Sequence, residues 1–241
     1  AEPLERRTAA ATMQKALLTP LPEHEHLRMA ARYVPAHHED HVGGDWYDAI
    51  RLEGGRLALV IGDVTGHSIA AAAAMSQLRG MLRTLVIDRH EPPSALLRRL
   101  EHTSHALGQT GLATVLIAYL DATPTGYALT WSNAGHPPPT LLLADGRATV
   151  LEGHDVLIGA VRRVSRRNHT YPLPAGSTLV LHTDGLVETR TASIDDGVAR
   201  LHELLGGHPA ATPEELADLM VTRAAAARGE DDVALLVVRI P

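Results

Sequence analysis

Residues 59–68 read LVIGDVTGHS, and the organisation of the chain follows from this stretch. An apolar run reaches the carboxylate of Asp63, turns at Gly66 and continues into five alanines at residues 70–74. This order predicts a strand that leads directly into a helix, because alanine favours helices strongly and Ser68 is a good N-cap. A carboxylate at the end of an apolar strand lies at the rim of the sheet, where it can meet a cation. Taken alone, the same corner is equally typical of a solvated aspartate with no function.

The composition predicts a packed aliphatic core without thiol chemistry. Of the 241 residues, 45% are hydrophobic, although Phe is absent and only 2 Trp and 5 Tyr are present. The lack of cysteine excludes disulfides, thiolate metal sites and cysteine nucleophiles, and it fits a reducing compartment. The net charge of -6 gives no reason to expect a nucleic-acid partner. Since no stretch approaches the roughly 20 apolar residues of a membrane helix, we expect a cytoplasmic protein without a membrane partner.

A predicted hairpin brings a second carboxylate, that of Asp45, toward Asp63. Gly43 and Gly44 precede Asp45 and allow the backbone to approach a neighbouring segment closely. The strand that follows turns at residues 53–55, Glu-Gly-Gly, and returns as the strand that leads to Asp63. The two carboxylates are therefore expected at the same end of one sheet.

Two more aspartates are expected at this end. Asp184 follows an apolar strand predicted at residues 177–182, and Asp231 precedes a final strand predicted at 233–240. If the final strand is antiparallel to its neighbours, it begins beside the ends of the other strands. Aspartates without nearby thiolates form a hard, oxygen-only donor set, which suits Mg²⁺ or Mn²⁺ better than zinc. Two such ions about 3.5 to 4 Å apart can hold a hydroxide between them for in-line attack on a phosphoryl group.

The rest of the chain alternates between strand and helix patterns. Helices are predicted at 1–18, 69–87, from Pro93 to about 108, at 197–205 and at 213–227, the last opened by a capping box at Thr212 and Glu215. Further strands are predicted at 29–34, 114–120, 127–132, 141–143, 149–151 and 169–173.

Two polar segments stand apart from this pattern. His37, His38 and His41 lie in one loop, but they lack the HExxH spacing of a zinc-binding helix, and a solvated loop is expected. Residues 152–166 combine glycines with several arginines, a composition that suits a mobile or partner-facing segment.

The motifs, in this order, resemble those of a known family. The blocks are GGDWYD at 43–48, GDVTGH at 62–67, SNAGHPP at 132–138, TDGLVE at 183–188 and DD at 231–232. They are similar to the sporulation stage II E (SpoIIE) branch of the metal-dependent Ser/Thr phosphatases, within the protein phosphatase type 2C superfamily. The resemblance covers about residues 28–240. It implies an α+β fold over residues 23–241, a four-layer α/β/β/α sandwich of two antiparallel sheets flanked by helices.

The resemblance also implies a binuclear site for two divalent cations, Mn²⁺ or Mg²⁺. Asp63 would bridge both ions, and the Val64 carbonyl would contact one of them. Asp184 and Asp231 would hold the other ion, and Asp45 would ligate directly or through water. Asp63 and Asp45 are thus the candidate catalytic residues.

Four more residues have two open interpretations each. Asp48 and Asp232 match motif positions, and each would either bind metal or orient other groups. His136, in a stiff proline-rich loop, would either reach a substrate or shape the rim of the site. His67 would either act as a general acid or pack where the helix begins.

The chain departs from eukaryotic relatives of this superfamily at several positions. Those relatives carry a glutamate just before the first aspartate and a phosphate-binding arginine five residues earlier, where this chain has Gly44 and Asp40. One metal site is therefore expected to have fewer protein ligands, and to fill only when a regulator or substrate orders the loops. The candidate general-acid histidine of those relatives corresponds to Thr65. Ser68 replaces a glycine usual in the SpoIIE branch, with little expected effect.

The implied function is hydrolysis of phosphoserine or phosphothreonine in a protein by a metal-bridged hydroxide. The implied substrate is a phosphorylated anti-sigma-factor antagonist, which takes part in partner-switching control of transcription. Two alternatives remain open. One is a pseudophosphatase that senses or scaffolds partners without turnover, and the other is a hydrolase of small phosphate esters.

Residues 1–22 are predicted to form a weakly amphipathic helix that ends at Pro20 and Pro22. Such a helix needs a partner, which would be either the following domain or a second copy of the chain in a homodimer. The segment also resembles the linker that joins an upstream sensor module to this type of catalytic domain.

Overall fold

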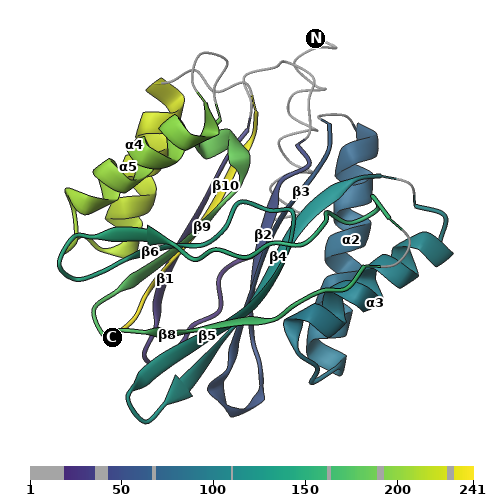
Figure 1. Ribbon diagram of the computed structural model, residues 1–241, viewed down its shortest axis with the longest axis horizontal. Coiled ribbons are helices and arrows are strands. Elements are labelled where there is room, and N and C mark those ends of the chain that lie inside the picture. The colour runs from purple at the N-terminus through teal and green to yellow at the C-terminus, as the bar shows by residue number, and fades with distance from the viewer. Residues whose placement is uncertain are drawn as a thin grey trace.

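The computed structural model describes most of the chain (Figure 1). The described ranges are 19–35, 43–66, 69–109, 111–161, 164–188, 193–226 and 231–241. Several predictions lie outside these residues: the helix at 1–18, the histidine loop at 37–41 with Asp40, and the roles of His67 and Ser68.

The described strands form two five-stranded sheets in which every strand pair is antiparallel. The first sheet has the order β1 (Arg28–Val34), β10 (Val233–Arg239), β9 (Thr178–His182), β6 (Thr140–Leu142) and β7 (Ala148–Val150). The second has the order β2 (Trp46–Arg51), β3 (Leu57–Val64), β4 (Ala113–Thr123), β5 (Gly126–Ala134) and β8 (His169–Leu173). The antiparallel pairing assumed for the final strand is thereby confirmed.

Helices cover the outer faces of both sheets and complete four layers (Figure 1). The second sheet is covered by α2 (Ile69–Asp88) and α3 (Pro93–Ala106), and the first by α4 (Ile194–Gly206) and α5 (Pro213–Ala226). Two short 3-10 helices, η1 (Glu53–Gly55) and η2 (Asp184–Leu186), lie at turns. The expected α/β/β/α sandwich is confirmed. No helix in the described ranges is both long and apolar enough to cross a membrane.

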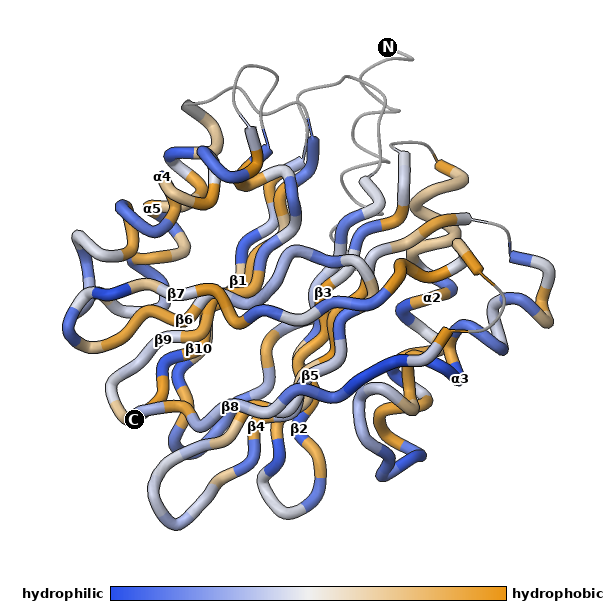
Figure 2. The backbone as a smooth tube through the Cα atoms, viewed as in Figure 1, coloured by the Kyte–Doolittle hydropathy of each residue, from blue (hydrophilic) through white to orange (hydrophobic). Residues whose placement is uncertain are grey.

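Apolar side chains pack in three layers, one between the sheets and one beneath each pair of helices. Figure 2 shows hydrophobic residues concentrated along the strands. In β3, Ile61 packs between the sheets whereas Val60 packs against the helical side, because successive side chains of a strand alternate in direction. The same alternation turns Asp63 toward the space between the sheets.

The end of β3 differs from its prediction. The strand continues to Val64, three residues beyond the apolar residues 57–61, because β4 pairs with it as far as Ala113 and because the Val64 N–H donates to the Gly44 carbonyl at 3.2 Å. Asp63 is therefore a residue of the strand itself, and not of the turn that follows.

The two C-terminal helices begin at capping boxes. The predicted pair at Thr212 and Glu215 is confirmed, since each side chain bonds to the backbone N–H of the other residue. In α4, Ser193 and Asp196 form the same motif, so that helix begins at 194, three residues earlier than predicted. The early start places a glycine, Gly197, inside the first turn, where a side chain would overlap the Val187 carbonyl.

Candidate active site

Asp45 and Asp63 face each other at one end of the second sheet. The β2–β3 register pairs Trp46 with Gly62, which places the preceding residue Asp45 opposite the following residue Asp63. Burial, followed by the charge of Asp63, raises the pKa of Asp45 well above its usual value. Burial, followed by the charge of Asp184, raises the pKa of Asp63 to about 7. The two carboxyl groups are therefore held in an environment that opposes a second negative charge.

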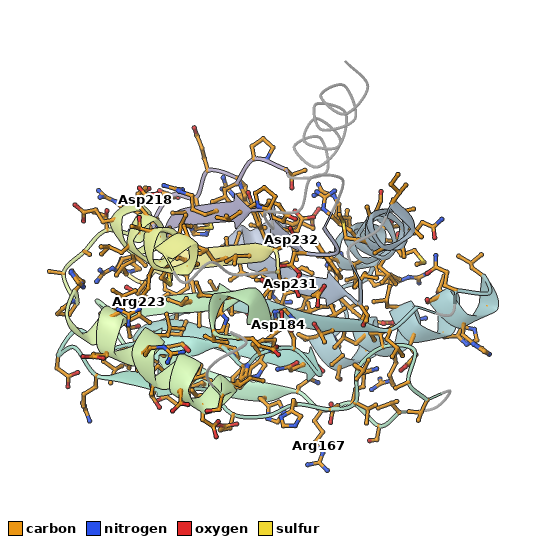
Figure 3. The ribbon with its side chains drawn as sticks, turned by 90° about the horizontal axis from the view of Figure 1, so that it is seen from above. Arg167, Asp184, Asp218, Arg223, Asp231 and Asp232 are labelled. Atoms are coloured by element: carbon orange, nitrogen blue, oxygen red, sulfur yellow. The ribbon has the colours of Figure 1, made fainter. Side chains whose placement is uncertain are left out.

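The first sheet contributes Asp184, Asp231 and Asp232 to the same region. Asp184 begins η2, with one residue between it and the end of β9, and the other two directly precede β10. Figure 3 shows the three side chains gathered between the two pairs of helices. Burial, followed by the charge of Asp231, raises the pKa of Asp184. The ends of both sheets thus supply carboxylates whose charges interact. Their location at the same end of the sandwich is the one predicted from the sequence.

The neighbours Asp231 and Asp232 have different environments. Asp232 is 4% exposed, whereas Asp231 is exposed and accepts the backbone N–H of Asp232 at 2.9 Å. Asp232 also shares its strand direction with Leu236, which packs between the sheets. The buried member of the pair is therefore Asp232, whereas the family resemblance implies Asp231 as the metal ligand.

Three glycines let other groups pack directly against their backbone, because these residues have no side chain in the way. A Cβ at Gly44 would overlap the Val64 carbonyl oxygen, and one at Gly43 would overlap the Asp232 carboxylate. A Cβ at Gly185 would overlap the Asp232 carbonyl oxygen. None of these glycines has a positive φ, so the motifs require them for close approach and not for an unusual backbone conformation.

The donor set fits hard divalent cations. It consists entirely of oxygen atoms, and two of them, Asp45 Oδ2 and Asp184 Oδ1, are buried without a hydrogen-bond partner among the described residues. A cation would satisfy both atoms and offset the burial and mutual repulsion that raise the carboxyl pKa values. In the described part of the chain, no three Asp, Glu or His side chains lie close enough to enclose one ion. Bound water would therefore have to complete the coordination of each cation.

Asp48 lies away from this site. It is 2% exposed and forms ion pairs with Arg83 at 2.6 Å and with Arg79 at 3.5 Å, both on α2. Its carboxylate also accepts the hydroxyl of Thr19 at 2.9 Å. These contacts favour a structural role over metal binding: Asp48 links β2 to α2 through its ion pairs.

Comparison with known proteins identifies the family. A sequence model of the family described as stage II sporulation protein E (SpoIIE) matches residues 53–241. The chain belongs to the SpoIIE family. The resemblance expected from the order of the motifs is confirmed.

This SpoIIE-family chain is similar to two curated proteins over most of its length. It is 25% identical over 240 residues to Protein IcfG of Synechocystis sp. and 26% identical over 211 residues to Phosphoserine phosphatase RsbU of Bacillus subtilis. The matches cover 88% and 86% of the chain but only 37% and 61% of those proteins. Among solved structures, the RsbU and RsbW domains of Rv1364c from Mycobacterium tuberculosis match with a TM-score of 0.81 and 31% identity. That match covers 92% of this chain and 62% of the other.

His136 of the SpoIIE-family motif SNAGHPP is buried. It is 3% exposed, and its Nδ1 lies 2.8 Å from Thr114 Oγ1. The Asn133 side chain holds the backbone of His136 through two bonds of 2.8 Å. Thr114 in turn pairs with Asp63 across the β3–β4 ladder, which places both side chains on one face. His136 thus contacts Thr114, the residue beside Asp63, from within the core. It does not face the solvent, from which a substrate would approach.

The described part of residues 152–166, expected to be either mobile or partner-facing, is held to the rest of the domain by backbone hydrogen bonds and an ion pair. Ile158 exchanges two backbone hydrogen bonds with Ala113, of 2.8 and 3.1 Å, beside the end of β3. Arg166 forms a buried ion pair of 2.8 Å with Glu101 of α3. The composition did not reveal these contacts, because they join residues that are far apart in the sequence.

Sequence reasoning also missed Tyr33 of β1. Its hydroxyl is buried at the same end of the sandwich and approaches the Asp232 carboxylate. Burial, followed by the charge of Asp232, raises the pKa of this phenol above its usual value. The alternation of β1 could have indicated this position. Met29 and Ala31 point toward the core between the sheets, and Tyr33 is the next residue on the same face.

Proposed function

We propose that this chain is a metal-dependent protein phosphatase domain that hydrolyses phosphoserine or phosphothreonine. The observation that carries the proposal is the buried, face-to-face pair of Asp45 and Asp63, with further carboxylates at the ends of the opposite sheet. The name of the relative RsbU, a phosphoserine phosphatase, supports the same reaction. The proposed substrate is a phosphorylated protein of the anti-sigma-factor-antagonist type in partner-switching signalling, within the cytoplasm.

The proposed cofactors are two divalent cations, Mn²⁺ or Mg²⁺. Asp63 would bridge them, with Asp45, Asp184 and Asp231 as further ligands and the Val64 carbonyl as a backbone ligand. When bound, the cations would neutralise the phosphoryl oxygens and activate water for in-line attack. Membership of the SpoIIE family and the oxygen-only donor set support this choice of metal.

The chain's own residues prepare the site in two ways. The aliphatic layer behind Asp63, which includes Ile61, keeps water away from the inner side of the carboxylates. The lower effective dielectric there strengthens every charge interaction with a phosphoryl group. Gly44 leaves the Val64 carbonyl uncovered, because any side chain at that position would overlap its oxygen. Together these features would leave the ligand oxygens facing the proposed cations with little competing water.

A scaffold or sensor without turnover is the second candidate. It is favoured by the glycine at position 44, where eukaryotic relatives carry a ligand glutamate, and by the absence of three close ligands among the described residues. The second metal would then bind weakly, or only with a partner present.

We also propose that residues 1–22 link the domain to an upstream sensor module and contribute to a homodimer. The hydroxyl of Thr19 accepts hydrogen bonds from Arg79 and Arg83 of α2, at 3.0 and 3.3 Å. Any movement of the N-terminal segment would therefore reach α2, which begins just after the strand that carries Asp63.

Hydrolysis assays separate these candidates. The purified chain is titrated with Mn²⁺ or Mg²⁺, using p-nitrophenyl phosphate and a phosphoserine protein of the antagonist type. A phosphatase shows saturable, metal-dependent hydrolysis that Asp63→Asn abolishes, while the exposed control Asp88→Asn retains it. A scaffold shows no metal-dependent hydrolysis with either substrate. A small-ester hydrolase turns over the phosphoprotein no faster than p-nitrophenyl phosphate.

A further inference from the structure

Tyr33 projects into the same end of the sandwich as the acidic cluster, although no motif includes it. In the β1–β10 ladder Tyr33 pairs with Ala234, and Asp232, just before β10, lies two residues before Ala234 and so on the same side of the strand. Met29 and Ala31, at alternate positions of β1, pack on the core between the sheets. The ring of Tyr33 therefore continues this inward row and ends beside Asp232.

Gly43 provides an independent measure of how closely these groups meet. A Cβ built on Gly43 would overlap both the Asp232 Oδ2 atom and the Tyr33 hydroxyl oxygen. The two oxygens thus lie around one point against the backbone of the Gly-Gly-Asp motif. No hydrogen-bond partner for the buried Tyr33 hydroxyl is found among the described residues, and the Asp232 carboxylate is the acceptor that lies beside it.

A hydrogen-bond donor at this position has a clear physical role. Asp232 is buried, and the negative charges of Asp45 and Asp63 lie near it. A phenol O–H directed at a carboxylate adds a charge-assisted hydrogen bond to one of its oxygens. It also fixes one carboxylate oxygen, so that the other oxygen can point toward the cluster.

We propose that Tyr33 is a positioning residue that donates a hydrogen bond to the Asp232 carboxylate and holds it as a ligand of the proposed cations. The inference rests on the proposed function, because it concerns the same metal site. It goes beyond that proposal in assigning Asp232, the buried member of the Asp231–Asp232 pair, to the metal site, and in assigning Tyr33 to Asp232.

Calorimetric titration of the full chain with Mn²⁺ alone tests the assignment without relying on turnover. Tyr33→Phe removes one oxygen and keeps the ring, and we expect it to weaken Mn²⁺ binding about tenfold, as loss of an outer hydrogen bond to a metal ligand usually does. Asp232→Asn should weaken binding at least as much. Because Tyr33 acts through Asp232, the double variant should bind no more weakly than Asp232→Asn alone.

Tyr127→Phe is the matched control. It deletes a hydroxyl from a core tyrosine at the start of β5, the end of that strand away from the acidic cluster. It should leave the Mn²⁺ affinity unchanged. An unchanged affinity in Tyr33→Phe, or additive losses in the double variant, would overturn the inference and leave the proposed function intact. If Tyr33→Phe does not fold, Asp232→Asn decides, and an unchanged affinity there overturns the inference. A wild-type chain that binds no Mn²⁺ overturns both the inference and the proposed function.

Discussion

Asp45 lies directly across the β2–β3 ladder from Asp63, and both carboxyl groups point into the space between the two sheets. Two adjacent buried acids oppose folding unless a proton or a cation reduces their charge. The arrangement therefore favours function at the expense of the stability of the metal-free chain, and this trade-off can be measured.

Asp45→Asn should stabilise the metal-free protein while weakening its response to metal. Asp45 must either stay charged beside Asp63 or take up a proton when the chain folds, and replacing it by a neutral amide is expected to raise the free energy of unfolding by about 1 to 2 kcal/mol. For a chain of this size, the melting temperature would rise by about 2 to 8 °C. Thermal unfolding with and without Mn²⁺ measures both effects. A metal-free variant that is less stable than the wild type would show that repulsion does not govern this pair.

Gly44→Ala should damage both stability and metal binding. The new methyl group would overlap the Val64 carbonyl oxygen, and backbone atoms cannot move away as a flexible side chain can. We expect a loss of about 1 to 3 kcal/mol in the free energy of unfolding, together with weaker Mn²⁺ binding.

Gly80→Ala is the matched control for this substitution. Gly80 lies within α2, and an added Cβ would meet nothing within 4 Å. There the same methyl group should stabilise the protein by about 0.5 to 1 kcal/mol through helix propensity. Equal effects of the two substitutions in denaturant unfolding would contradict the role assigned to Gly44.

Asp48→Asn should separate stability from catalysis. Its carboxylate joins β2 to Arg83 and Arg79 of α2 within a largely buried cluster. Removing the charge leaves both guanidinium groups without their carboxylate partner, at an expected loss of about 2 to 4 kcal/mol in the free energy of unfolding. At a temperature where the variant remains folded, the Mn²⁺ concentration that gives half-maximal hydrolysis should stay unchanged. A large shift in that Mn²⁺ concentration would indicate that Asp48 takes part in metal binding.

His136 should make the protein less stable as the pH falls. Burial, followed by the charge of His182, lowers the pKa of His136 to about 3, from an ordinary value near 6.5. Between these values the unfolded chain binds a proton that the folded chain does not. The stability that His136 contributes is therefore fully present above pH 6.5 and is lost as the pH falls toward 3, by up to about 1.4 kcal/mol per pH unit.

Denaturant unfolding at pH 7, 6 and 5 tests this dependence through the difference between the wild type and His136→Asn. The comparison must be made by difference, because the carboxyl groups with raised pKa values contribute in the opposite direction. The wild type should lose more stability than the variant over this interval. Parallel pH profiles would show that His136 does not titrate in the expected way.

The strand pattern predicted the arrangement of Asp45, Asp63 and Asp184 because strand ends and hairpins are local features of the sequence. The period of two in β3 places Asp63 on the same face as Ile61, and the short turn at residues 53–55 fixes the hairpin register. Antiparallel pairing of β10 was the one assumption needed to bring its preceding aspartates to the same end.

Other features could not be predicted, because they depend on how distant segments meet. Sequence alone does not show that Tyr33 and Asp232 share one corner, since their strands are almost 200 residues apart. Likewise, Arg166 finds Glu101 only after α3 and the second sheet have packed together. The burial of His136 also depends on Thr114, a residue outside every recognised motif.

Anomalous diffraction from crystals soaked in Mn²⁺ tests the central claim, that the facing pair of Asp45 and Asp63 forms a binuclear metal site. We expect two manganese peaks at this end of the sandwich, with Asp63 contacting both ions. Manganese bound only elsewhere on the chain, or no manganese within reach of Asp63 at saturating concentration, would contradict it.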